Sequence, residues 1–150
     1  HLEEHSIEVQ LPFIRFLFPE ANIVPILLGS NNVDLLKTVS GSLESVFGNE
    51  FGRTLFVVSA NMSSYLPAKE AREFCEKMVK IVEKGDLGSL YEEIKSGNNN
   101  MKELGCVAIL LSLAGIGSSV KVLRKKDSSK YGCENDNIVC YAAITVEKAG

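Results

Sequence analysis

Residues 54–59 read Thr-Leu-Phe-Val-Val-Ser, a short and mostly apolar run rich in β-branched side chains. A run of this kind, with no polar alternation, is typical of a strand that is covered on both faces. A second apolar run, Asn-Ile-Val-Pro-Ile-Leu-Leu-Gly, occupies residues 22–29. Its Pro25 has no N–H to donate to a neighbouring strand. We therefore expect a strand at residues 54–59, and an edge or locally irregular strand at residues 22–29.

Apolar residues at helical spacing surround these two runs and predict helices. The helices are expected at residues 4–17, 32–47, 67–83, 86–94 and 104–114. Pro12 should kink or break the first helix, because it cannot donate to the preceding turn. Residues 119–123 and 138–146 predict two further strands. Since strands alternate with helices, the predicted fold class is α/β, a mostly parallel sheet with helices on both faces. The carboxyl ends of its strands would place residues 29–32 and 60–65 near any site.

The composition of the chain excludes several classes of protein. Its 150 residues, 45% of them apolar, are enough for a single domain with a core. The net charge of −3 argues against nucleic-acid binding, which needs a basic face. We find no apolar run of transmembrane length and no secretory leader, so we expect a cytoplasmic protein. Because the chain begins at His1, already within a helical pattern, we also expect it to be a fragment of a longer protein.

The four cysteines form no Cys-x-x-Cys pair, so the standard zinc and thioredoxin signals are absent from the sequence. Cys75 and Cys106 lie in helical patterns and are interpreted as small buried apolar residues. Cys133 and Cys140 flank a predicted turn and are candidates for a disulfide across it. In a cytosolic protein the reduced state is the expected one.

Polar residues that offer chemistry are few. His5 is the one histidine besides His1, and its imidazole can bind a metal or carry a proton, or simply lie at the surface. The segment Ala-Asn-Met-Ser-Ser-Tyr at residues 60–65 either lines a pocket or forms a turn that caps the next helix. The sequence contains no nucleophile elbow, no phosphate-binding loop and no dinucleotide fingerprint. A hydrolase that pairs Ser63 or Ser64 with His5 is the remaining local alternative.

A family resemblance appears at the first residues. His1-Leu-Glu-Glu-His-Ser-Ile-Glu-Val-Gln-Leu-Pro-Phe13 resembles the opening signature of Memo-like proteins, Glu-His-Ser-(Ile/Leu)-Glu-x-(Gln/His)-Leu-Pro-(Phe/Tyr). Ile23-Val-Pro-Ile-Leu-Leu-Gly29 and Phe56-Val-Val-Ser59 are similar to two of the family's strands, and Val139-Cys-Tyr-Ala-Ala143 is similar to its terminal motif. The resemblance extends over essentially the whole chain.

The resemblance implies a fold similar to that of the class III extradiol dioxygenases, with residues 1–150 forming the C-terminal portion of one Memo-like domain. It also implies a site of histidines, an aspartate and a cysteine that is associated with metal binding and redox chemistry, with Fe, Cu or Zn as the candidate metals. AMMECR-type and radical-SAM proteins are the partners that it implies.

Matched position by position, the resemblance selects His5 as a catalytic residue and metal ligand, and Cys106 as a second metal ligand. The binding residues are predicted to be Glu4, Asn61, Ser64, Gly105 and Tyr141. Asn61 stands where the family has aspartate, and Ser64 where it has histidine. The family's Cys-Gly pair is Leu104-Gly105 here, with Cys106 on the other side of the glycine. An iron site needs about three N or O ligands, and this chain keeps one matched imidazole.

These substitutions favour a degenerate, non-catalytic family member that acts as a binding or scaffold module. The alternative is a metal-dependent (non-haem iron or copper) redox or dioxygenase-type enzyme whose site is completed by an upstream segment. A sheet that lacks upstream strands would expose an edge, and exposed edges pair with other chains. We therefore also expect a homo-oligomer.

Overall fold

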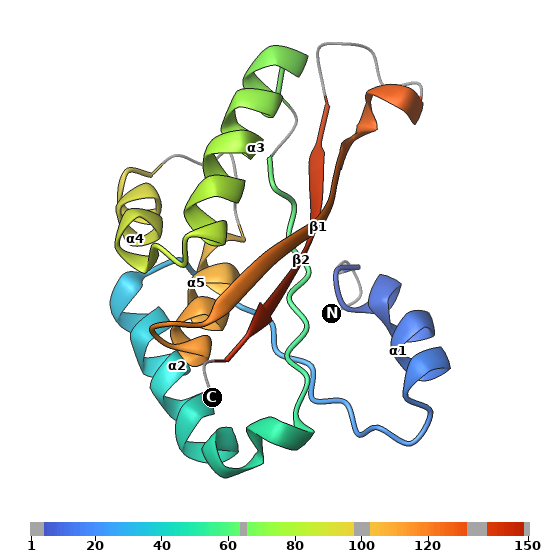
Figure 1. Ribbon diagram of the computed structural model, residues 1–150, viewed down its shortest axis with the longest axis vertical. Coiled ribbons are helices and arrows are strands. Elements are labelled where there is room, and N and C mark those ends of the chain that lie inside the picture. The colour runs from blue at the N-terminus through green and yellow to red at the C-terminus, as the bar shows by residue number, and fades with distance from the viewer. Residues whose placement is uncertain (1–4, 64–65, 98–102, 132–137, 149–150) are drawn as a thin grey trace.

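The computed structural model describes residues 5–63, 66–97, 103–131 and 138–148 (Figure 1). Its α-helices are α1 (Leu11–Leu17), α2 (Val33–Phe47), α3 (Ala68–Glu83), α4 (Leu87–Lys95) and α5 (Leu104–Ala114). Three 3₁₀ helices accompany them, η1 (Glu8–Gln10), η2 (Gly48–Arg53) and η3 (Ser128–Tyr131). The two strands are β1 (Ser119–Asp127) and β2 (Cys140–Glu147). Neither of the predicted early strands is among them.

Most of the predicted helices are confirmed, and local signals explain where they begin and break. Asn32 caps α2, because its side-chain oxygen accepts a hydrogen bond from Leu35 N at 3.0 Å. Asp86 caps α4 in the same way through Ser89 N, also at 3.0 Å. The predicted first helix is broken into η1 and α1, with Pro12 in the first turn of α1, where its missing N–H costs no hydrogen bond.

The sheet differs from the predicted one. Within the described ranges it has two strands, β1 and β2, which pair antiparallel from Ser119↔Glu147 to Asp127↔Cys140, with an irregularity between Val122 and Arg124. The prediction of a mostly parallel sheet with helices on both faces is therefore wrong. The paired strands follow one another along the chain. Strands joined by a short connection pair antiparallel, whereas parallel neighbours need a longer crossover.

The apolar runs at residues 22–29 and 54–59 belong to no strand ladder in the part of the chain that the structure describes. The second run still has an inner and an outer side. Phe56 packs its ring against Phe47 and Phe51, with centroid distances of 5.8 and 5.7 Å, whereas Leu55 and Val57 are exposed. An apolar run indicates that a segment tends to be covered, but a strand also needs a partner, which the run itself does not specify.

The core lies on one side of the β1–β2 ribbon. In Figure 1, α2 to α5 gather on that side, while α1 lies apart on the other. Helix α5 is buried over most of its length, as its apolar sequence predicts, and packs with Leu36 of α2, Met78 of α3 and Leu90 of α4. Along β2, alternate side chains turn toward these helices and the others are exposed. One face of the ribbon is therefore covered, not two.

Helix α1 and the segment after it carry much of the exposed apolar surface. These exposed side chains are Phe13, Phe16, Leu17, Phe18, Val24, Ile26 and Leu27. None of the helices in the described ranges combines the length and the apolar character that crossing a membrane requires.

Candidate functional site

His5 lies just before η1 and is largely exposed. Its Nδ1 is 3.3 Å from Oε2 of Glu8, one turn further along the chain. Glu4, the preceding motif residue, is outside the described residues, as is Ser64. The ring of His5 therefore contacts a residue of its own motif, and within the part of the chain that the structure covers it makes no hydrogen bond to Ser63 or to Cys106.

Gly105 and Asn31 connect the start of α5 to the loop at residues 29–32. The backbone N–H of Gly105 donates to Oδ1 of Asn31 at 3.1 Å. A Cβ on Gly105 would lie 2.5 Å from that oxygen and 2.8 Å from side-chain carbons of Leu28 and Leu36. The glycine thus allows α5 to approach the loop closely. Here the predicted binding residue has a packing role.

Cys106 follows in the first turn of α5 and is half-buried. Burial raises the pKa of its thiol, with a smaller contribution from the nearby Glu103 carboxylate. The sulfur is therefore a neutral thiol at neutral pH, whereas metal binding needs the thiolate.

Asn61 and Tyr141 lie on either side of a junction between the segment before α3 and the start of β2. Met62 N donates to the carbonyl of Cys140 at 3.0 Å, and Cys140 N donates to Oγ of Ser63, also at 3.0 Å. Asn61 and Tyr141, the immediate neighbours of these paired residues, are both exposed. The structure thus brings two predicted binding residues to one region. They lie there because the residues next to them in the sequence are joined by hydrogen bonds.

A second contact brings the opening motif's helix toward the same segment. Gln10 Nε2 donates to Oγ of Ser59 across a long 3.5 Å hydrogen bond. The contacts of Gly105 and Cys106, by contrast, are with Asn31, Glu103 and their surroundings. Hydrogen bonds therefore link residues 5–10 to residue 59, and residues 29–32 to the start of α5.

The resemblance implies a metal site, which needs several ligand side chains close together. No group of three His, Cys, Asp or Glu side chains in the described ranges is arranged so that it could hold a metal ion. Asn61 contributes a neutral amide where a carboxylate would offset the charge of a cation, and Cys106 stands on the other side of Gly105 from the family's cysteine. These residues do not fit a three-ligand iron or copper site by themselves.

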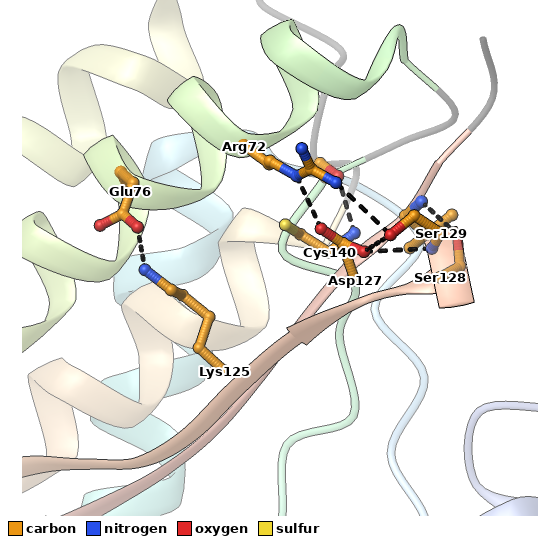
Figure 2. Close-up of polar contacts among 9 residues, drawn as sticks. Arg72, Glu76, Lys125, Asp127, Ser128, Ser129 and Cys140 are labelled. Carbon is orange, nitrogen blue, oxygen red and sulfur yellow. Dashed lines mark hydrogen bonds and ion pairs between the residues drawn. The ribbon is translucent and has the colours of Figure 1, made fainter. Parts of the chain in front are cut away.

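A pocket that sequence reasoning missed lies between α3 and the Asp127–Cys140 end of the ribbon (Figure 2). It encloses about 190 Å³. Its lining residues are Arg72, Cys75, Glu76, Lys125, Lys126, Asp127 and Cys140. They come from α3, β1 and β2, so no local sequence motif predicts the pocket.

Two ion pairs form the walls of this pocket. Arg72 Nε donates to Oδ2 of Asp127 at 2.7 Å, and the backbone N–H and hydroxyl of Ser129 donate to Oδ1. The hydrogen bonds from Ser129 and then from Arg72 lower the pKa of Asp127 to about 2. Lys125 donates to Glu76, and this hydrogen bond lowers the pKa of Glu76 and raises that of Lys125. Both cations are thus held in place beside the pocket.

Two cysteines complete the pocket lining. Cys75, on the inner face of α3, and Cys140, the first residue of β2, are both buried free cysteines. The thiol of Cys75 hydrogen-bonds to the sulfur of Cys140, which lowers the pKa of Cys140, while the same contact and burial raise the pKa of Cys75. The prediction that Cys75 is buried is confirmed. The pairing of Cys140 with Cys133 stays a prediction, because Cys133 lies outside the described residues.

Comparison with known proteins agrees with the opening motif. The family model for Memo-like proteins matches residues 1–145. The chain is 31% identical to a MEMO1 family protein of Thermotoga neapolitana, over 94% of this chain and 50% of the relative. It is 32% identical to a MEMO1 family protein of Methanosarcina acetivorans, over 98% of this chain and 56% of the relative. The chain thus spans about half the length of the curated relatives that it matches. On the extent of these matches, the chain belongs to the Memo-like protein family.

Proposed function

We propose that this chain is a binding or scaffold module of the Memo-like family and does not form a metal enzyme by itself. The observation that carries the proposal is the environment of His5. Its imidazole is exposed, and among the described residues its polar contact is with Glu8 in its own turn. An imidazole in a metal site is normally joined by other ligands and oriented by a second partner.

The substituted positions support the same proposal. Asn61 cannot supply negative charge, and the neighbouring Ser63 hydroxyl is buried and already accepts a hydrogen bond from Cys140 N. Cys106 lies beside Gly105, whose N–H is bonded to Asn31 in the other region. The exposed groups at this junction are the amide of Asn61 and the phenol ring of Tyr141, which suit recognition better than redox chemistry.

Metal analysis tests this proposal. The purified protein is incubated in turn with Fe²⁺, Cu²⁺ and Zn²⁺, desalted and analysed for bound metal. We expect well below one metal per chain, and the same value for His5→Ala and for the matched control His1→Ala. About one metal per chain that is lost in His5→Ala but kept in His1→Ala would overturn the proposal.

That overturning result would favour the second candidate, a metal-dependent redox or dioxygenase-type enzyme completed by other parts of a longer chain. The observation in its favour is the Gln10–Ser59 contact, which joins the helix of the opening motif to the segment that carries Asn61. As partners of the binding module we propose AMMECR-type and radical-SAM proteins. Co-purification with such proteins, at a fixed stoichiometry and dependent on Asn61 or Tyr141, is the corresponding measurement.

A further inference from the structure

The paired cysteines of the α3–ribbon pocket support an inference that is independent of the family site. We propose that Cys75 and Cys140 are a redox-active thiol pair, which hydrogen peroxide oxidises to a disulfide, with Cys140 as the attacking sulfur and Cys75 as the resolving one. The function is a peroxide-responsive cross-link between α3 and β2.

The two sulfurs are held in position by well-anchored backbone. Cys75 lies within α3, between the buried residues Phe74 and Met78. Cys140 is fixed on both sides of its peptide, because its N–H donates to Ser63 and its carbonyl accepts from Met62, each at 3.0 Å. The two thiols thus line one pocket from two well-anchored elements, which is the arrangement that a disulfide between α3 and β2 requires.

The surroundings assign the two roles. Cys75 donates its hydrogen bond to Cys140, so the negative charge of the pair resides preferentially on Cys140, and its pKa is lowered. The positive charges of Lys125 and Arg72 act in the same direction, whereas Asp127 opposes them. A thiolate, not a thiol, is the nucleophile, so Cys140 is the sulfur that attacks first.

The pocket has room for the oxidant. Both cysteines line a pocket of about 190 Å³ and are almost completely buried. A water molecule occupies about 30 Å³ of liquid, so hydrogen peroxide, which is only somewhat larger, fits in this pocket.

The reaction balances with one peroxide for each pair. The Cys140 thiolate attacks one peroxide oxygen, the S–O bond forms and the O–O bond breaks, and the departing hydroxide takes a proton to become water. Cys75, losing its proton, then attacks the sulfur of Cys140 and displaces the bound oxygen as a second water. Two thiols lose two electrons in total, and the peroxide gains them.

Peptide mapping of the whole chain tests the proposal. The reduced protein is treated with an equimolar amount of hydrogen peroxide, the remaining thiols are alkylated under denaturing conditions, and the digest is analysed by mass spectrometry. We expect a cross-linked peptide pair that contains Cys75 and Cys140 and has lost two hydrogens. Cys106→Ser is the matched control and should form the same cross-link. A Cys133–Cys140 cross-link, or oxidation confined to Cys106, would overturn the proposal.

Single variants test the two roles. In Cys75→Ser the sulfenic acid on Cys140 has no resolving thiol, so a dimedone adduct should accumulate at Cys140. In Cys140→Ser, Cys75 should stay unmodified at the same peroxide dose. Dimedone labelling of Cys75 instead would show the opposite order of attack and overturn the assignment. The mapping of the unsubstituted protein does not depend on whether either variant folds.

Discussion

Arg72 of α3 donates a hydrogen bond from Nε to Oδ2 of Asp127 across 2.7 Å, which ties the helix to the last residue of β1. Ser129 satisfies the other carboxylate oxygen. Asp127 also faces Cys140 in the strand register. This one carboxylate therefore organises the wall of the pocket, the end of the ribbon and the packing of α3.

The first prediction concerns the stability of the protein in acid. The pKa of Asp127 is lowered from 3.8 to about 2 in the folded state, so its ionised form stabilises the fold above the ordinary pKa. That contribution is lost as the pH falls from about 4 through about 2. Asp127→Asn should cost roughly 1 kcal/mol near neutral pH. The free energies of unfolding of the two proteins should converge at the acid end of this window.

Glu73→Gln is the matched control for this prediction, because Glu73 is an exposed carboxylate on the same helix, paired with Lys69 at 3.9 Å. Urea titrations at a series of pH values provide the measurement. A constant difference between the parent and Asp127→Asn across the whole window would contradict the assignment.

The second prediction concerns the contact between α5 and the loop at residues 29–32. Gly105→Ala places a Cβ 2.5 Å from Oδ1 of Asn31, closer than atoms can pack. The loop or the helix must shift, and we expect a loss of about 1–3 kcal/mol in the free energy of unfolding. Gly41→Ala in α2 meets nothing within 4 Å and should be neutral or stabilising by up to about 1 kcal/mol. Equal effects of the two substitutions in urea denaturation would rule out the close approach.

The third prediction concerns the junction at Ser63. Its hydroxyl is fully buried and accepts the hydrogen bond of Cys140 N, so Ser63→Ala leaves that N–H without its acceptor. We expect a cost of about 1–3 kcal/mol in unfolding free energy. Ser42→Ala removes an exposed hydroxyl that bonds only its own helix and should change stability by less than about 0.5 kcal/mol. Thermal or urea unfolding distinguishes the two variants, and an unchanged stability of Ser63→Ala would contradict a stabilising role for this hydrogen bond.

The fourth prediction concerns self-association. Val24 and Val57 are exposed on segments that join no strand ladder in the described residues. We expect a second copy of the chain to cover this surface, since unpaired extended segments pair with other chains. Size-exclusion chromatography with light scattering at micromolar protein should show a dimer or larger. The double variant Val24→Lys with Val57→Lys should shift the mass toward the monomer, whereas Val46→Lys on the exposed side of α2 should not. A monomeric parent protein would contradict the predicted self-association.

The helices are the part of the fold that the sequence predicted best. The helix expected at residues 32–47 is observed as Val33–Phe47, and the one expected at 104–114 is observed with those bounds and is buried. The break near Pro12 and the cap at Asn32 depend on residues within one turn. Each hydrogen bond of an α-helix joins residues four positions apart, so a short stretch of sequence contains most of the information that predicts a helix.

Whether the predicted residues form one functional site stays a prediction. The family motif was recognised, and Asn61 and Tyr141 lie at one junction, but Gly105 has a packing role next to Asn31. The pocket that joins Arg72 to Asp127 was not anticipated, since its ion pair spans two elements. No pattern within either element identifies the other as its partner.

By itself, the sequence determined the family, the positions of the helices and the apolar character of residues 54–59. Only the tertiary structure decided that β1 pairs antiparallel with β2, that residues 54–59 lie beside the ribbon without a ladder, and that Cys140 meets Cys75. The physical reason is the range of the interactions. A helix is stabilised by bonds between near neighbours, whereas a strand ladder or a thiol pair exists only where packing brings distant segments together.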